Sequence, residues 1–297
     1  MRAHRSLRSL LLAWLATLPL TAAAQPDAAI FWSLQRDGQT AGYLLGTIHS
    51  EDPRVLDFPD GFIERLNGSD IFAMELVPDL PTLSRLTAYM QYADGSTLES
   101  RIGADRFARL QDALSGYEMP PGWIARMKVW AAMMTLSVPP PKSGFFMDFS
   151  LSLRAAGAGL EVVGLETLEQ QLSFLENMPL PQQIELLDHA LDEFDRVEQA
   201  HRQMVDSYLA GDLLDLRRET EQQMAVLDPE TRDYFIREGI DERNRRMFEA
   251  VRTHLARGRV FIAVGALHLP GETGLIALLR SAGYDLEPLP LPFSAAE

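Results

Sequence analysis

The chain of 297 residues contains no cysteine, so it forms no disulfide and has no cysteine nucleophile. It also lacks a Gly-x-Ser-x-Gly nucleophile elbow and a glycine-rich loop of the kind that cradles phosphate. Low-complexity segments are missing as well, and 46% of the residues are hydrophobic, which is typical of globular proteins. Stability must therefore come from a packed hydrophobic core, and the chain is long enough to form one.

Basic side chains are scarce. The 27 Lys and Arg residues stand against 42 Asp and Glu, which gives a formal net charge of −15 at pH 7. A surface of this sign repels nucleic acid and anionic lipid, and it concentrates cations near any cleft. We therefore expect no nucleic-acid partner.

Long apolar runs are confined to the N-terminus, where three arginines precede the run from Leu10 to Leu20 and small residues follow it. This order predicts a secretory signal peptide at residues 1–24, cleaved near Ala24, with an uncleaved anchor as the alternative. No later stretch is apolar for long enough to cross a membrane. We expect a periplasmic or secreted protein whose residues 25–297 form a single domain.

Six short stretches are rich in β-branched and aromatic residues and end at turn residues, which predicts strands. They are Ala29–Leu34, Ala41–His49, Ser69–Leu76, Leu160–Thr167, Arg259–His268 and Tyr284–Leu291. Helical periodicity predicts helices between them, at 82–93, 95–114, 121–136, 146–159, 181–211 and 228–258. The expected fold class is α/β (mixed α+β), a mixed sheet flanked by helices, with a helical insertion at about 80–159 and 180–257.

Two of the predicted strands end in the same motif, Gly-x-x-His. The stretches are "YLLGTIHS" (Tyr43–Ser50) and "VFIAVGALHLPG" (Val260–Gly271), and a helix and a further strand follow each. Strand, Gly-x-x-His, helix and strand thus occur twice, which indicates two half-units of one sheet. Both histidines follow the end of a strand, which is where α/β proteins bind their ligands. If the two strands are neighbours in the sheet, His49 and His268 lie close together. Two independent structural histidines are the alternative.

Two imidazoles at one edge of a sheet suit a divalent transition metal, which needs a further anionic ligand. Glu75 is the best candidate, because it is a charge within the apolar stretch "IFAMELV", where an unpaired carboxylate is costly to bury. Glu166 has the same setting after "EVVGL". The alternative is that each carboxylate leaves the sheet into solvent or caps a helix.

The motifs "GTIH", "AMEL", "GLET", "DERNRRM" and "VGALHLPG", in this order, resemble those of the TraB/PrgY/GumN family, whose relatives include the Tiki proteases. The resemblance implies a fold similar to the erythromycin-esterase/ChaN group. It also implies a peptidase that depends on manganese or cobalt, with His49, Glu75 and His268 as metal ligands. Zinc and iron are alternatives, since two histidines and a carboxylate suit several metals.

Glu166, Arg243 and Asn244 also fall on motif positions of the family. Glu166 would act as general base or as a further metal ligand. Arg243 would stabilise an oxyanion or bind a substrate carboxylate, and Asn244 would bind the substrate or orient a ligand. A solvated helix face is the alternative for "RNRR", and it explains Arg245 and Arg246 better than Asn244.

The sequence therefore predicts an exported metal-dependent hydrolase that acts on a peptide or protein. The alternative is a non-catalytic periplasmic protein that binds a peptide, a metal or a cofactor, or that serves envelope polysaccharide export. The two hypotheses differ in one observable property: only the hydrolase has a bound metal that keeps an exchangeable water and supports turnover of a substrate.

Overall fold

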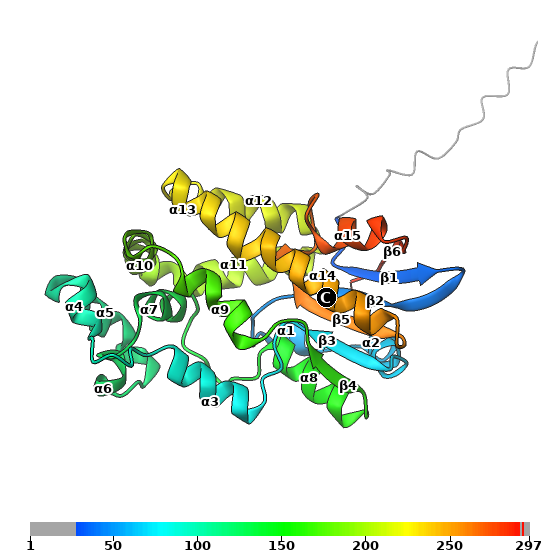
Figure 1. Cartoon of the computed structure of the whole chain (residues 1–297), viewed down its shortest axis with the longest axis horizontal. Coiled ribbons are helices and arrows are strands. Elements are labelled where there is room, and N and C mark those ends of the chain that lie inside the picture. Colours follow the sequence, from blue (N-terminus) through cyan, green and yellow to red (C-terminus); the bar gives the residue numbers. More distant parts are fainter. Residues whose placement is uncertain (1–27, 292, 294–297) are drawn as a thin grey trace, which may run out of the picture.

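The computed structural model of the chain describes residues 28–291 and 293, and it contains all six predicted strands in one mixed sheet (Figure 1). The strand order is β4-β3-β5-β2-β1-β6. The strands are β1 (Phe31–Arg36), β2 (Gln39–Thr47), β3 (Ile71–Met74), β4 (Glu161–Gly164), β5 (Val260–Gly265) and β6 (Asp285–Leu289). The predicted α/β class is confirmed. The predicted signal peptide, residues 1–24, lies outside the described residues.

Strands β2, β3, β4 and β5 run parallel, whereas β1 pairs antiparallel with both β2 and β6. The β1–β2 hairpin turns at Asp37 and Gly38, whose φ angles of 52° and 73° match the twist of the strands. The two strands that carry Gly-x-x-His are direct neighbours, with Thr47 opposite Gly265. The carboxyl ends of the four parallel strands therefore share one edge of the sheet.

The central strand β5 is buried on both faces, since Val260, Phe261, Ile262, Ala263 and Val264 are each at most 1% exposed. A continuous apolar run is typical of a strand that is covered on both sides.

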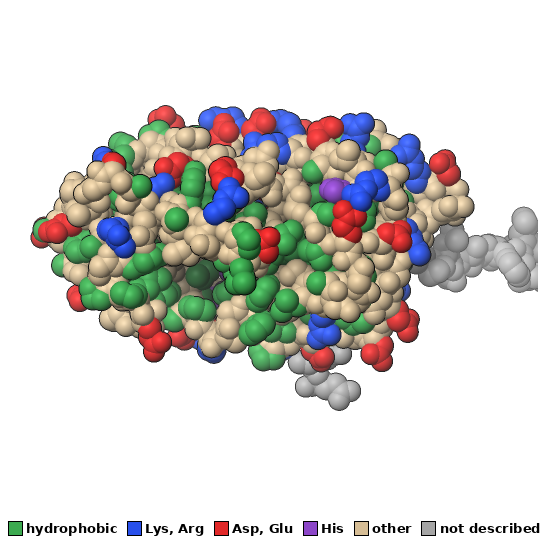
Figure 2. Space-filling view, turned by 60° about the horizontal axis from the view of Figure 1, so that its bottom comes forward, with side chains coloured by type: hydrophobic (Ala, Val, Ile, Leu, Met, Phe, Trp, Pro, Cys, Tyr) green, Lys and Arg blue, Asp and Glu red, His purple; other side chains and the backbone are tan. Residues whose placement is uncertain are grey.

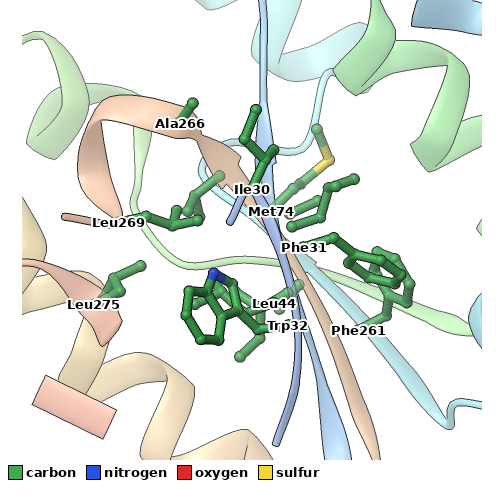
Figure 3. Packing of buried hydrophobic residues seen from close by; sticks show 14 of the residues in the cluster. Ile30, Phe31, Trp32, Leu44, Met74, Phe261, Ala266, Leu269 and Leu275 are labelled. Atoms are coloured by element: carbon green, nitrogen blue, oxygen red, sulfur yellow. The ribbon is translucent and has the colours of Figure 1, made fainter. Parts of the chain in front are cut away.

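Neighbouring side chains of β1 point to opposite faces of the sheet (Figure 3). Phe31 lies beside Phe261 on one face, with 6.0 Å between ring centroids. Trp32 turns toward Leu269 and Leu275 on the other. The core therefore has two layers, one on each side of the sheet.

Helices cover the sheet and continue beyond it, to the left in Figure 1, around a second hydrophobic cluster that includes Leu98, Trp130 and Leu187.

None of the helices in the described part of the chain is long and apolar enough to cross a membrane. The helices are α1 (Pro53–Leu56), α2 (Asp60–Asn67), α3 (Leu80–Tyr89), α4 (Leu98–Ile102), α5 (Ala104–Ala113), α6 (Pro121–Ile124), α7 (Val129–Leu136), α8 (Met147–Gly157), α9 (Leu168–Glu176), α10 (Leu180–Glu193), α11 (Val197–Ala210), α12 (Leu213–Met224), α13 (Pro229–Tyr234), α14 (Glu242–Leu255) and α15 (Leu275–Ser281).

The predicted helix at 121–136 is wrong in its middle, where a turn at 125–126 and a short extended stretch at Met127 and Lys128 separate α6 from α7. Met127 forms a β-bridge with Gln91, and the Lys128 N–H donates to the Met90 carbonyl at 2.9 Å. Backbone groups of a distant segment thus replace helical hydrogen bonds, which a pattern of apolar residues does not reveal.

The two long helices predicted at 181–211 and 228–258 are also interrupted. A 3-10 turn at Phe194–Arg196 separates α10 from α11, and a π-helix at Phe235–Asp241 joins α13 to α14. Helix α12 was not predicted, because its sequence is mostly polar and only Leu213 and Leu216 are buried in it.

Candidate functional site

Five of the six predicted site residues meet at the carboxyl edge of the sheet. Glu75 directly follows β3, Glu166 follows β4, and His268 follows β5. Arg243 and Asn244 come from the first turn of α14, which directly follows the π-helix. π-helical segments often occur next to functional sites, since their extra residue changes which side chains face the neighbouring element.

Arg243 lies between the two glutamates. Its Nε and Nη2 donate to Glu166 Oε2 at 2.9 and 2.7 Å, and Nη2 also donates to Glu75 Oε2 at 2.6 Å. The arginine side chain is 9% exposed, and the side chains of Glu75 and Glu166 are 20% and 0% exposed. Charge-assisted bonds of this geometry hold a guanidinium in a fixed orientation.

Glu75 receives further hydrogen bonds from two other elements. Gln171 Nε2 donates to Oε2 at 3.0 Å, and the Gly265 N–H donates to Oε1 at 2.8 Å. A Cβ at position 265 would lie 3.2 Å from Oε1, so glycine permits this close approach. Burial raises the pKa of Glu75, but the charges of protonated His268 and Arg243 and the Gly265 N–H outweigh it and hold the pKa at about 2.

Glu166 is the more deeply buried carboxylate. Its Oε1 has no hydrogen-bond partner, and Arg246 Nη2 lies 3.6 Å away. Burial raises the pKa of Glu166 and the Glu75 charge adds to this, against the opposing effect of Arg243. Because the side chain is closed off from solvent, its contacts serve to hold Arg243 against Glu75.

His268 is 7% exposed, and its Nδ1 lies 2.7 Å from Asn244 Oδ1. The amide oxygen only accepts hydrogen bonds, so Nδ1 carries the ring proton and donates it to Asn244, and Nε2 keeps its lone pair. Burial lowers the pKa of His268 to about 4, with Arg243 adding to the shift and Glu75 opposing it. The imidazole is therefore neutral near pH 7.

His268 Nε2 and Glu75 Oε1 lie 3.7 Å apart, and both are unprotonated near neutral pH. Neutral imidazole nitrogens and carboxylate oxygens are common ligands of divalent metals, so the chemistry of this pair fits a metal ion. Across residues 28–291 and 293, no group of three or more His, Asp or Glu side chains is arranged to hold a metal ion. The described residues thus supply two adjacent donors.

His49 lies apart from these five residues. Its ring stacks on Phe146, with 3.8 Å between centroids and 14° between planes, and its Nδ1 lies 3.9 Å from Asp148 Oδ2. The side chain is 59% exposed. The two motif histidines therefore share an edge of the sheet but not a contact in the described structure.

Two residues of this edge were missed by the sequence interpretation. Gln171 lies in the first turn of α9, after the capping box of Thr167 and Gln170. Asp148 lies in the first turn of α8. For Asp148 the signal was a polar side chain just inside the predicted helix 146–159. Helix α9 was not predicted, and its signal was the capping pair Thr167 and Gln170 at the end of a predicted strand.

Hydrophobic side chains gather on one face of the molecule, around a hollow (Figure 2). The large apolar residues that are exposed along α3, α7, α8 and the segment before α8 are Leu80, Leu83, Met134, Phe145 and Leu153. Phe145 directly precedes Phe146, on which His49 stacks. Phe145 therefore places exposed apolar surface next to the carboxyl edge of the sheet.

Comparison with known proteins gives a family model, TraB/PrgY/gumN, that matches residues 30–288. Metalloprotease TIKI1 of Danio rerio is 25% identical over 314 residues, which cover 88% of this chain and 63% of that protein. Metalloprotease TIKI2 of Danio rerio is 24% identical, with 90% and 62% covered. YbaP of Escherichia coli (strain K12) is 24% identical, with 80% and 87% covered. The chain thus spans under two thirds of the length of the two TIKI relatives. No solved structure matches it.

Proposed function

The chain belongs to the TraB/PrgY/gumN family, and from this premise we propose that it is a metal-dependent hydrolase of peptides. One observation carries the proposal: His268 Nε2 and Glu75 Oε1 lie 3.7 Å apart at the carboxyl edge of the sheet, both with lone pairs free near neutral pH. The metalloprotease names of two relatives at 24–25% identity support the hydrolase class.

His49 completes the proposed donor set with Glu75 and His268. The parallel pairing of β2 with β5, with Thr47 opposite Gly265, supports this because it brings both Gly-x-x-His motifs to one edge. Manganese or cobalt is the proposed metal, with zinc and iron as alternatives that the same ligand types accept. When bound, the metal would supply a water acidic enough to attack a peptide carbonyl near neutral pH.

The chain's own residues would prepare the site for this chemistry. Asn244 fixes the tautomer of His268 so that Nε2 faces Glu75. Arg243, held by two carboxylates, places a fixed positive charge where it can stabilise negative charge on the substrate. A general base or metal ligand must touch the reacting atoms, and the Glu166 side chain is fully buried against Arg243. We therefore propose Glu166 as the anchor of Arg243.

The apolar surface next to the carboxyl edge supports a substrate with large apolar side chains, such as an extended peptide. The proposed location is the periplasm or the cell exterior, which rests on the predicted signal peptide. A fold related to the erythromycin-esterase/ChaN group is likewise a proposal, supported by the parallel strands that carry the repeated Gly-x-x-His motif.

Calorimetry with manganese, cobalt and zinc tests the proposal on wild type and on His49→Ala, Glu75→Ala and His268→Ala. We expect one metal per chain and a loss of affinity of about tenfold or more in each variant. His254→Ala is the matched control, since His254 lies in the last turn of α14, at the other end of the helix from Arg243, and contacts Arg257 just beyond it. Wild type and control should hydrolyse unstructured peptides with bound metal, and the three variants should not.

If wild type binds none of the three metals, or if all variants bind alike, the hydrolase proposal is rejected. A non-catalytic binding protein is the second candidate, favoured by the exposed apolar residues next to the carboxyl edge, which would bind a peptide without a metal. Metal or peptide binding without turnover, under conditions where the metal is bound in full, would establish it instead.

A further inference from the structure

The two motif histidines have matching surroundings although they do not touch. His268 Nδ1 faces an oxygen of Asn244, which lies in the first turn of α14. His49 Nδ1 faces an oxygen of Asp148, which lies in the first turn of α8. In each case a helix that starts at the carboxyl edge of the sheet presents an oxygen to the same ring nitrogen.

Asp148 is itself fixed by the strand that carries His49. Thr47, the last residue of β2, donates from Oγ1 to Asp148 Oδ1 at 2.5 Å, and Thr47 is 3% exposed. The other carboxylate oxygen, Oδ2, faces His49 Nδ1 at 3.9 Å. The carboxylate thus connects the end of β2 to the histidine two residues further on.

The plane of the His49 ring is set by a second contact. Phe146, the residue before α8, stacks on the ring with 3.8 Å between centroids and 14° between planes. With the ring plane fixed and Nδ1 toward Asp148, a movement of about 1 Å closes the remaining distance to a hydrogen bond. Nε2, on the opposite side of the ring, then points away from Asp148.

We propose that Asp148 is a positioning residue, which accepts the Nδ1–H of His49 and thereby leaves Nε2 unprotonated and free to bind. A carboxylate is a pure acceptor, so the ring nitrogen that faces it carries the proton. Such outer carboxylates fix the tautomer of histidines and increase their basicity as ligands. The benefit to metal or substrate binding rests on the proposed function, whereas the tautomer does not.

Long-range ¹⁵N–¹H NMR of the metal-free protein, at alkaline pH where imidazoles are neutral, reads the tautomer directly. The His49 signals are assigned by their loss in His49→Gln. We expect the Nδ1–H tautomer in wild type, the Nε2–H tautomer in Asp148→Ala, and the wild-type tautomer in Asp148→Asn, whose amide oxygen still accepts. Asp206→Ala, a 62% exposed aspartate paired with Arg54, is the matched control and should leave the tautomer unchanged.

Calorimetry with manganese provides the second readout. Asp148→Ala should weaken binding by about 10- to 100-fold, and Asp148→Asn should restore most of the affinity. Should Asp148→Ala fail to fold, Thr47→Val removes the bond that holds Asp148 and should raise the Nε2–H fraction without removing the carboxylate.

An Nε2–H tautomer in wild type, or a tautomer that neither Asp148→Ala nor Thr47→Val changes, overturns the assignment. Absence of metal binding in wild type would reject the proposed function instead, and the tautomer measurement would still decide the role of Asp148. The two failures are therefore distinguishable.

Discussion

Arg243 compensates the two buried negative charges at the carboxyl edge of the sheet, because it forms ion pairs with both Glu75 and Glu166. Arg243→Met removes the guanidinium and leaves two carboxylates close together with little solvent. We expect a loss of about 3–5 kcal/mol in the free energy of unfolding, measured by urea denaturation. Arg245→Met is the control on the same helix.

Arg245 is 53% exposed and pairs with Glu242 on the helix surface, so its replacement should change stability by less than about 0.5 kcal/mol. The two results together separate the buried cluster from the solvated helix face that the "RNRR" stretch also contains. If the two substitutions lowered the free energy of unfolding equally, Arg243 would not be the residue that stabilises the buried carboxylates.

The neutral imidazole of His268 gives the metal-free protein a specific pH dependence. Its pKa is about 4 when folded and 6.5 when unfolded, so between these values the unfolded chain binds the proton more readily. The stability that His268 contributes is therefore complete above pH 6.5 and lost as the pH falls toward 4, by up to about 3 kcal/mol. Urea midpoints at the two ends of this window measure the loss.

His268→Gln should flatten the dependence in that window, because the titrating group is gone. Glu75, whose pKa falls from 4.5 to about 2, acts in the same direction but below pH 4.5. An unchanged slope between pH 6.5 and 4 in His268→Gln would show that another group titrates there.

At the scale of elements, the approach of β2 to β5 decides where the two motifs lie. Gly42 pairs with Val260, and a Cβ on Gly42 would lie 2.1 Å from the Val260 carbonyl oxygen. Gly42→Ala must push the two strands apart. We expect a loss of about 1–3 kcal/mol in stability, measured by urea denaturation, and weaker metal binding, because both motifs follow these strands.

Gly122 in α6 is the matched control, since a Cβ there meets no atom within 4 Å. Gly122→Ala should leave stability unchanged or raise it slightly, by restricting the unfolded chain. If Gly42→Ala is as stable as wild type, the close approach of β2 to β5 at Gly42 is not required for the stability of the sheet.

At the scale of the whole molecule, the candidate site lies where the two hydrophobic clusters meet. Helix α9 presents Gln171 to Glu75 and buries Leu175 in the helical cluster. The single domain predicted for residues 25–297 requires that both clusters unfold together. We expect coincident urea transitions from Trp32, in the sheet cluster, and Trp130, in the helical cluster.

Variants that keep Trp32 or Trp130 and replace the other tryptophans of residues 25–297 by Phe report each cluster by fluorescence. The far-ultraviolet circular dichroism of each variant, recorded in the same titration, checks that both remain folded. Two separate midpoints would show that the helical insertion is an independent unit and would contradict the single-domain prediction.

The sequence by itself determined the strands, the two Gly-x-x-His motifs at strand ends and the acidic charge. These features depend on composition and on local spacing, which folding does not alter. It also indicated Glu75 and Glu166, because a charge inside an apolar stretch needs a partner whatever the fold.

Only the tertiary structure decided which partners they have. Arg243 lies 168 residues from Glu75 and 77 from Glu166 along the chain, and the docking of α14 on the sheet edge brings them together. The same applies to His49, which shares an edge with His268 yet faces Asp148. Side-chain contacts follow from how helices dock and which rotamers pack there, and neither is encoded in the local spacing of residues.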